Sequence, residues 1–281
     1  MREIRAIDVC AGGGGWAVAA RGTPIRIVAA FDHDEDCLAT YSFNHPGVES
    51  IQCDVTTHDF SKWAGIDLIL GGIPCEEVSL ARNLVPLAAS DEARIAALVD
   101  RCVGLPSELN AQWWCYEDVP QIRRFLPLFT PYFELDSQYF SAQRRKRIYI
   151  GNLPKPVEQS NDTRLSQHLR PGPFRIGQKV LRSRPCRAKT YTATTFYDWD
   201  PAAKSPTVIG LSSRHDNYAA VGFPGGYRQL QWQELASLQG FPADYTFIGS
   251  PTSTSKMISQ AVQIDTARAI LSRFIEDLSH A

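Results

Sequence analysis

Three kinds of side chain stand where they could act together on one reacting carbon. Cys75 follows residues 71–74 directly after a predicted strand, and a cysteine at the carboxyl edge of a parallel sheet is placed as a nucleophile. Glu117 ends another predicted strand at the same edge. Arg145 and Arg147 are two residues apart in an extended segment, so their side chains share a face and can point into one cleft. These residue types favour an enzyme that uses a covalent step.

A glycine-rich turn follows the first predicted strand. Residues 10–15, here called the glycine loop, read CAGGGG, and such a turn lets a ligand approach the backbone closely. Asp32 ends the second predicted strand, where a carboxylate would meet a ribose diol, and Asp54 closes the third, where one would meet an adenine amine. The loop alone fits NAD, FAD and S-adenosylmethionine (SAM) equally, and one acid at a strand end is as often a helix cap. The combination predicts a nucleoside-containing cofactor.

The elements that must position these residues alternate along the first half of the chain. Short β-branched or aromatic runs alternate with helix-like segments, which is typical of a parallel sheet with crossover helices. The predicted strands cover residues 5–10, 25–31, 50–55, 66–70, 113–117, 133–139 and 147–151. The clearest helix is predicted over 91–102 with Ser90 as its N-cap, and a closing helix is expected within 255–278.

Composition excludes several classes of protein. Of 281 residues, 44% are hydrophobic and 21% are charged, which are ordinary globular values, and no apolar run approaches the ~20 residues of a membrane helix. The seven cysteines are odd in number and include no Cys-x-x-Cys pair, so neither a disulfide framework nor a metal site is expected. No signal-peptide core follows Met1, and we expect a cytoplasmic protein without membrane contact.

Charge is distributed unevenly along the chain. The net charge is −1, yet between Gln143 and Thr190 thirteen Lys and Arg residues stand against two acids, a local charge of +11. The remainder of the chain therefore carries −12. A basic segment on an acidic body indicates a polyanion-binding face, although charge alone also fits a solvated loop.

Taken together, the motifs resemble the DNA (cytosine-5)-methyltransferases. Seven features follow the order of that family over nearly the whole chain. They are the glycine loop, the strand-end acids, Pro74-Cys75, Glu117-x-Val119, Gln143-x-Arg145-x-Arg147, the segment from Arg228 to Pro242, and a terminal motif from Ser259 to Ile270. The interval from residue 148 to 227 holds only 80 residues, which is short for the family.

The resemblance implies an α/β fold, a Rossmann-like SAM-dependent methyltransferase domain with a small inserted target-recognition domain. Residues 1–154 and 255–281 would form the SAM-binding catalytic domain, 155–226 the recognition domain, and 227–254 a hinge and connecting segment.

It also implies roles for individual residues. Cys75, Glu117, Arg145 and Arg147 would be catalytic. The cofactor SAM would contact residues of the glycine loop and of the strand ends: Asp8, Ala11, Gly12, Gly13, Gly14, Gly15, Trp16, Asp32, His33, Asp54, Val55, Pro74, Ala261 and Val262. The partner of a monomeric enzyme would be double-stranded DNA, contacted by Ser79, Gln143, Arg182, Arg184 and Arg228.

Cytosine chemistry explains the catalytic residue types. Carbon 5 is a poor nucleophile, and attack of the Cys75 thiolate on carbon 6 would turn the ring into an enamine that takes a methyl group. Glu117 at ring nitrogen N3 and Arg147, with Arg145 beside it, at the carbonyl of carbon 2 would stabilise the developing charge. Because carbon 6 is inaccessible in a stacked duplex, the base must be flipped out, at a cost of a few kcal/mol.

Several positions depart from the family pattern. Glu76 follows the cysteine where glutamine is common, and Asp118 replaces the asparagine of Glu-Asn-Val. Cys10 stands where a phenylalanine usually packs on the adenine, and Ser259-Gln260 replaces Gly-Asn. The extra carboxylates leave weakened DNA binding, an altered substrate and lost activity open.

Three alternative functions therefore remain. The same chemistry could act on RNA, or the chain could be a catalytically altered DNA-binding relative, against which the intact Cys75, Glu117 and Arg147 count. A nucleotide-dependent oxidoreductase is disfavoured because the glycine loop lacks the spacing Gly-x-Gly-x-x-Gly. Within the family, the small size is typical of a bacterial or phage modification enzyme, and no recognition sequence can be inferred.

The basic segment generates a testable prediction. Replacing Arg182 and Arg184 together with alanine should lower the slope of log K against log salt by up to ~2, because each phosphate contact releases counterions. Fluorescence anisotropy of a labelled duplex over a salt series measures the slope, with a double alanine variant of Arg268 and Arg273 as the matched control. An unchanged slope would mean that these arginines face solvent or the protein itself.

Overall fold

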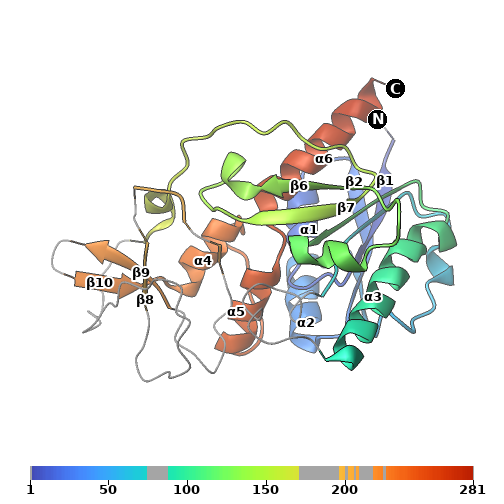
Figure 1. The fold of residues 1–281 in the computed structure, drawn as a ribbon, viewed down its shortest axis with the longest axis horizontal. Coiled ribbons are helices and arrows are strands. Elements are labelled where there is room, and N and C mark those ends of the chain that lie inside the picture. The colour runs from blue at the N-terminus through green and yellow to red at the C-terminus, as the bar shows by residue number, and fades with distance from the viewer. Residues whose placement is uncertain are drawn as a thin grey trace.

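A seven-stranded sheet forms the body of the protein, seen in a computed structural model that describes residues 2–74, 88–170, 196–199, 202–205, 207–208, 218–223 and 226–280 (Figure 1). The strand order is β3-β2-β1-β4-β5-β7-β6, and all neighbouring strands are parallel except that β7 runs antiparallel to both β5 and β6. The strands are β1 Ile4–Val9, β2 Ile25–Asp32, β3 Glu49–Gln52, β4 Leu68–Gly72, β5 Trp113–Asp118, β6 Tyr132–Asp136 and β7 Lys146–Gly151. The predicted α/β, Rossmann-like class is confirmed.

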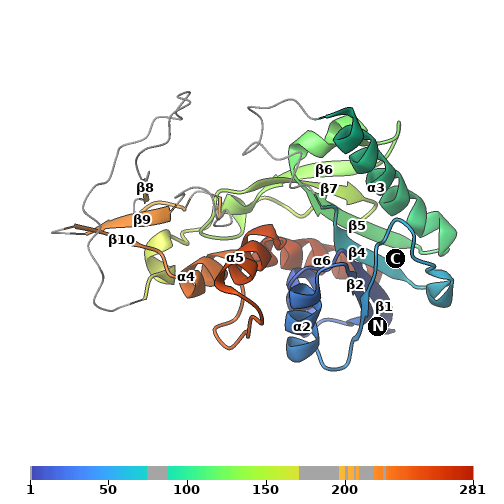
Figure 2. The same cartoon turned by 90° about the horizontal axis from the view of Figure 1, so that it is seen from below.

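Helices cover both faces of this sheet. They are α1 Gly15–Ala20, α2 Glu35–Asn44, α3 Ala89–Glu108, α4 Trp232–Gln239, α5 Pro251–Gln260 and α6 Ile264–Ser279. Leu68 and Leu70 of β4 face the core shared with α1 and α6, whereas Ile69 between them faces the core shared with α3. This period of two explains why the strands read as continuous apolar runs. Figure 2 shows α3 and α6 on opposite sides of the sheet.

A second, three-stranded sheet lies apart from the first, beyond α4 and α5 (Figures 1 and 2). It consists of β8 Phe196–Trp199, β9 Tyr218–Phe223 and β10 Gly226–Gln229. β9 and β10 pair antiparallel, and β8 pairs parallel to β9. The boundary expected at residue 226 falls at the start of β10.

Several short 3-10 helices connect the main elements. The 3-10 turns are Ser61–Trp63, Pro120–Phe125, Ser137–Tyr139 and Leu165–His168. Within the described ranges, no helix combines the length and the apolar character needed to cross a membrane.

The helix expected over 91–102 is longer than predicted. α3 begins at Ala89 with Ala88 as an N-cap that makes no side-chain hydrogen bond, so Ser90 lies inside the helix. It continues to Glu108 because Leu105 extends the buried face formed by its earlier apolar residues.

Other predicted bounds also change. The closing helix expected within 255–278 is two helices, because the Gln263 side chain accepts a hydrogen bond from Thr266 N and caps a new helix, α6. The third strand ends at Gln52 rather than at residue 55, and Asp54 forms a turn by accepting a 2.9 Å hydrogen bond from Thr56 N. β6 ends at Asp136, where a 3-10 turn begins.

Packing of β4 against β1 yields a prediction about stability. A Cβ added at Gly71 would lie 2.2 Å from the carbonyl oxygen of Val9, so Gly71→Ala should destabilise the fold by roughly 3 kcal/mol or more. Apart from the backbone of α3 itself, no atom of the described residues lies within 4 Å of the Cβ position of Gly104, and Gly104→Ala should be neutral or stabilising by about 0.5–1 kcal/mol. Urea unfolding of both variants measures the difference, and similar stabilities would contradict the predicted contact.

Candidate active site

The strand ends gather the predicted site residues at one edge of the sheet. The carboxyl ends of the parallel strands β1, β2, β4 and β5 meet there, and the antiparallel β7 begins at the same edge. This topology brings the glycine loop, Asp32, Pro74, Glu117 and Arg147 to a common side.

Hydrogen bonds hold the glycine loop in one conformation. Gly12 and Gly14 have positive φ angles of 54° and 87°, which favour glycine. Ala11 N donates to the carbonyl oxygen of Phe31 at 2.9 Å, and Gly14 N donates to that of Ala11 at 3.1 Å. Apart from the chain neighbours of Gly12, no atom of the described residues lies within 4 Å of the position that a Cβ would take there, so these residues leave this part of the loop open to a ligand.

The Asp32 side chain binds the backbone of the glycine loop. Its Oδ2 accepts a 2.8 Å hydrogen bond from Gly12 N, and its Oδ1 accepts one from Asp34 N at 3.0 Å. Burial opposes ionisation of Asp32, but these bonds and the nearby His33 outweigh it and lower the pKa of the carboxyl. The His33 ring lies 3.4 Å from Asp32 and is 70% exposed, and the Asp32 hydrogen bond raises the pKa of the imidazole.

Asp54 lies on the surface, where its carboxylate is accessible to a ligand. Its Oδ1 accepts hydrogen bonds from both N and Oγ1 of Thr56, which lower the pKa of the carboxyl. Arg101 of α3 holds the following turn, with Nε donating to Val55 O at 3.2 Å and Nη2 donating to His58 O at 3.1 Å. Arg101 was missed from the sequence because nothing in its spacing indicates a loop contact.

Asp8 and Trp16, one on each side of the glycine loop in the sequence, are both buried. Asp8 is fully buried, and burial raises the pKa of its carboxyl well above the usual range. Its Oδ2 accepts a hydrogen bond from Tyr41, whereas its Oδ1 meets no donor among the described residues. The Trp16 indole is buried and donates to Gly71 O at 2.9 Å. The side chain of Trp16 is therefore part of the core, and its contact with SAM stays a prediction.

The junction of α5 and α6 borders the same loop. The Cβ position of Gly15 lies 3.0 Å from Val262, and that of Gly13 lies 3.4 Å from Met257. Val262 is buried, Ala261 is half-buried and Pro74, at the end of β4, is exposed. The cofactor residues predicted at the two ends of the chain therefore border one loop.

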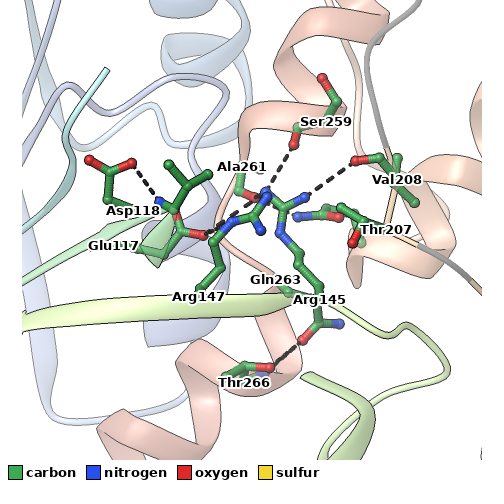
Figure 3. A network of polar contacts seen from close by, with 12 residues as sticks. Glu117, Asp118, Arg145, Arg147, Thr207, Val208, Ser259, Ala261, Gln263 and Thr266 are labelled. Atoms are coloured by element: carbon green, nitrogen blue, oxygen red, sulfur yellow. Dashed lines mark hydrogen bonds and ion pairs between the residues drawn. The ribbon is translucent and has the colours of Figure 1, made fainter. Parts of the chain in front are cut away.

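A buried ion pair joins β5 to β7. Glu117 is buried at the end of β5, and its Oε1 lies 3.0 Å from Nε of Arg147, whose side chain is 14% exposed (Figure 3). Arg147 Nη1 also donates to the carbonyl oxygen of Lys146. In register, Glu117 lies opposite Tyr149, so alternation along β7 places Arg147 on the same face as Glu117. This face presents a carboxyl and a guanidinium side by side.

Arg145 has a different environment from Arg147. It is 2% exposed, and its guanidinium donates to the carbonyl oxygens of Ser259 at 2.9 Å, Ala261 at 3.1 Å and Val208 at 3.3 Å (Figure 3). The distance from Arg145 Nη2 to Glu117 Oε1 is 4.0 Å. The arginine motif therefore supplies one guanidinium beside Glu117 and one that binds three carbonyl oxygens, two of them at the α5–α6 junction.

The substituted acid Asp118 points away from Glu117. Alternation along β5 places Asp118 on the side of Tyr116 and α3, and it is 1% exposed. Its Oδ1 accepts a 2.5 Å hydrogen bond from Val119 N. The extra carboxylate that follows Glu117 thus lies on the opposite face from the Glu117–Arg147 pair.

Gln143 does not have the environment expected of a DNA-contacting residue. Its side chain is 0% exposed, donates to Leu238 O and to the Gln239 side chain, and accepts from Val208 N at 3.0 Å. Its amide is satisfied inside the protein, and the contact between Gln143 and DNA stays a prediction. Arg228 belongs to β10.

Four predicted residues lie outside the described residues: Cys75, Ser79, Arg182 and Arg184.

Known proteins resemble this chain in sequence and in fold. The type II methyltransferase M.NgoMIV of Neisseria gonorrhoeae is 23% identical to this chain, over 98% of each sequence. The solved structure of EhMeth from Entamoeba histolytica superposes with a TM-score of 0.73 at 12% identity, covering 99% of both chains. That of the Dnmt2 methyltransferase of S. pombe gives 0.71 at 14% identity, covering 98% of this chain and 99% of its own. These two likenesses concern the fold.

A family model for C-5 cytosine-specific DNA methylases matches residues 4–99 and 178–276, which is more than half of the chain. The chain therefore belongs to the C-5 cytosine-specific DNA methylase family.

Proposed function

We propose that this protein transfers a methyl group from SAM to carbon 5 of cytosine in double-stranded DNA, at a short recognition site. The observation that carries the proposal is the buried Glu117–Arg147 pair at 3.0 Å. The pair lies at the edge of the sheet where the glycine loop follows β1. A carboxyl and a guanidinium side by side match ring nitrogen N3 and the carbonyl oxygen of cytosine.

The residues present fit SAM. The glycine loop is open at Gly12, and the exposed Asp54 is accessible to an adenine amine. When bound, SAM would supply an electrophilic methyl group.

The chain's own residues would perform the remaining chemistry. The Cys75 thiolate would bond to carbon 6 of the flipped-out base, and the electron pair of the double bond would move toward carbon 5. Glu117 would hydrogen-bond N3, and Arg147 the carbonyl oxygen of carbon 2, so that negative charge on the ring is stabilised. After transfer, a water molecule would remove the proton from carbon 5, and the bond to Cys75 would break.

Target recognition would reside in residues 155–226. Each bidentate base contact discriminates by roughly 1–3 kcal/mol, and a short insert offers few of them, so a site of about two to four base pairs is expected. The small sheet β8–β10 would support these contacts.

Sequencing of DNA from an expressing cell, with a readout of 5-methylcytosine and its flanking bases, tests the function directly. Parallel assays with labelled SAM should give transfer to duplex DNA and not to structured RNA. Transfer to RNA alone would overturn the DNA assignment, and SAM binding without transfer would indicate a catalytically altered relative.

The nucleophile gives a second prediction. Cys75→Ala should abolish methyl transfer while SAM binding persists, because the glycine loop and the strand-end acids are separate from the thiol. A 5-fluorocytosine duplex should trap an adduct on the peptide containing residue 75, since fluorine cannot leave as a cation. Cys37→Ala, in a buried part of α2, is the matched control and should keep the adduct. Transfer by Cys75→Ala within tenfold of wild type would contradict the covalent mechanism.

The cofactor site gives a third prediction. Asp54→Ala should weaken SAM binding about 5- to 30-fold, the value of one hydrogen bond to the cofactor, with DNA affinity little changed. Asp59 is a matched control, because it is also exposed and also accepts a hydrogen bond from the backbone two residues later. Asp32→Ala should weaken SAM binding and also lower Tm, because Gly12 N and Asp34 N would lose their acceptor. Isothermal titration calorimetry should show unchanged SAM affinity for Asp59→Ala. Equal losses of SAM affinity in the Asp54 and Asp59 variants would contradict the proposed contact between Asp54 and the adenine.

A further inference from the structure

Tyr245 reaches the glycine loop from the far end of the sequence. Its side chain is buried, and its hydroxyl donates a 2.6 Å hydrogen bond to the carbonyl oxygen of Gly13. The same hydroxyl lies 2.6 Å from the position that a Cβ would take on Gly14. The absence of a side chain at Gly14 therefore makes room for the Tyr245 hydroxyl.

Proton counting orders the contacts of this hydroxyl. A tyrosine hydroxyl has one proton, and here Gly13 O accepts it, so the hydroxyl oxygen must accept from its other neighbour. That neighbour is His45 Nε2 at 3.2 Å, which therefore carries a proton. Burial, together with the positive charge of Arg21, lowers the pKa of His45 to about 4, so its ring is neutral near pH 7. The result is a directed chain from His45 through Tyr245 to Gly13.

This chain fixes one peptide group of the loop from both sides. The peptide between Gly13 and Gly14 has its carbonyl held by Tyr245, and its N–H donates to Ala11 O at 3.1 Å. A glycine peptide without these contacts has many accessible orientations, and ordering it would cost free energy when a ligand binds.

The segment that carries Tyr245 is itself anchored to α2. Asn44 donates to Thr246 O at 2.7 Å and accepts from Thr246 N at 3.1 Å. Thr40 exchanges hydrogen bonds in the same way with Ile248, at 3.2 and 2.8 Å. Two side chains of α2 thus bind both backbone groups of Thr246 and of Ile248. These four hydrogen bonds restrict the motion of the segment that carries Tyr245.

We propose that Tyr245 is a positioning residue for the cofactor, which it serves by holding the Gly13–Gly14 peptide in the binding conformation. The inference rests on the proposed use of SAM and adds a residue from outside the motifs predicted to bind it. Loss of the hydroxyl should weaken cofactor binding and leave the transfer step intact once cofactor saturates the enzyme.

Tyr245→Phe removes only the hydroxyl and keeps the ring. Titration calorimetry with SAM, and separately with its demethylated product, should show Kd raised about 5- to 30-fold, while kcat at saturating SAM stays within twofold of wild type. Tyr132→Phe makes the same chemical change at an exposed tyrosine of the edge strand β6 and should leave both Kd values unchanged. His45→Phe keeps the bond from Tyr245 to Gly13 and should raise Kd by less than Tyr245→Phe does.

The possible outcomes separate this inference from the proposed function. If Tyr245→Phe lowers Tm but binds SAM as wild type does, the hydroxyl is only structural and the inference is overturned. If wild type binds SAM without methylating cytosine and Tyr245→Phe weakens that binding, the inference stands and the proposed function fails. If wild type does not bind SAM, both fail together. A Kd for His45→Phe above that of Tyr245→Phe would contradict the order of the hydrogen-bond chain.

Discussion

The ion pair between Glu117 and Arg147 depends on a single topological feature, the insertion of β7 antiparallel beside β5. If the strand beside β5 were parallel to it, that strand would end next to Glu117. Its first residues would then lie at the opposite edge of the sheet. Because β7 runs the other way, the first residues of one strand meet the last residues of another. Burying one charge alone would be costly, and each member of the pair offsets the desolvation of the other. The remaining site residues are arranged around this meeting point.

Several buried polar side chains connect this point to the C-terminal part of the chain. Arg145 binds carbonyl oxygens of the α5–α6 junction, and Gln143 binds the end of α4. Gln239 also donates to Ala261 O at 2.5 Å. Such groups are stable only when each is hydrogen-bonded, so they specify one arrangement of the segments that they join. The segment that leads into β7, the end of α4 and the α5–α6 junction are therefore held together by buried polar contacts.

The sequence predicts the main sheet well because parallel strands buried on both faces leave an unmistakable apolar pattern. It also names Glu117 and Arg147 as candidate site residues, and the structure brings their two side chains together. It does not show which polar or aromatic residues are buried, since residue type alone suggests exposure or ligand contact. Trp16, which donates to Gly71 O, and Gln143, which donates to Leu238 O and to the Gln239 side chain, are examples. Tyr245 shows the converse, because only folding brings it to Gly13, 232 positions away.

Helix α6 packs on the same face of the main sheet as α1, although the two helices lie far apart in the sequence. The core that contains both helices also contains residues of β7 and α4, so it fixes both ends of the segment between them. The entropy of closing a flexible loop grows only with the logarithm of its length, and doubling that length costs about 0.6 kcal/mol. A longer or shorter insertion at this position would therefore change stability little. Evolution could vary the length of this segment almost freely while the core on either side keeps its structure.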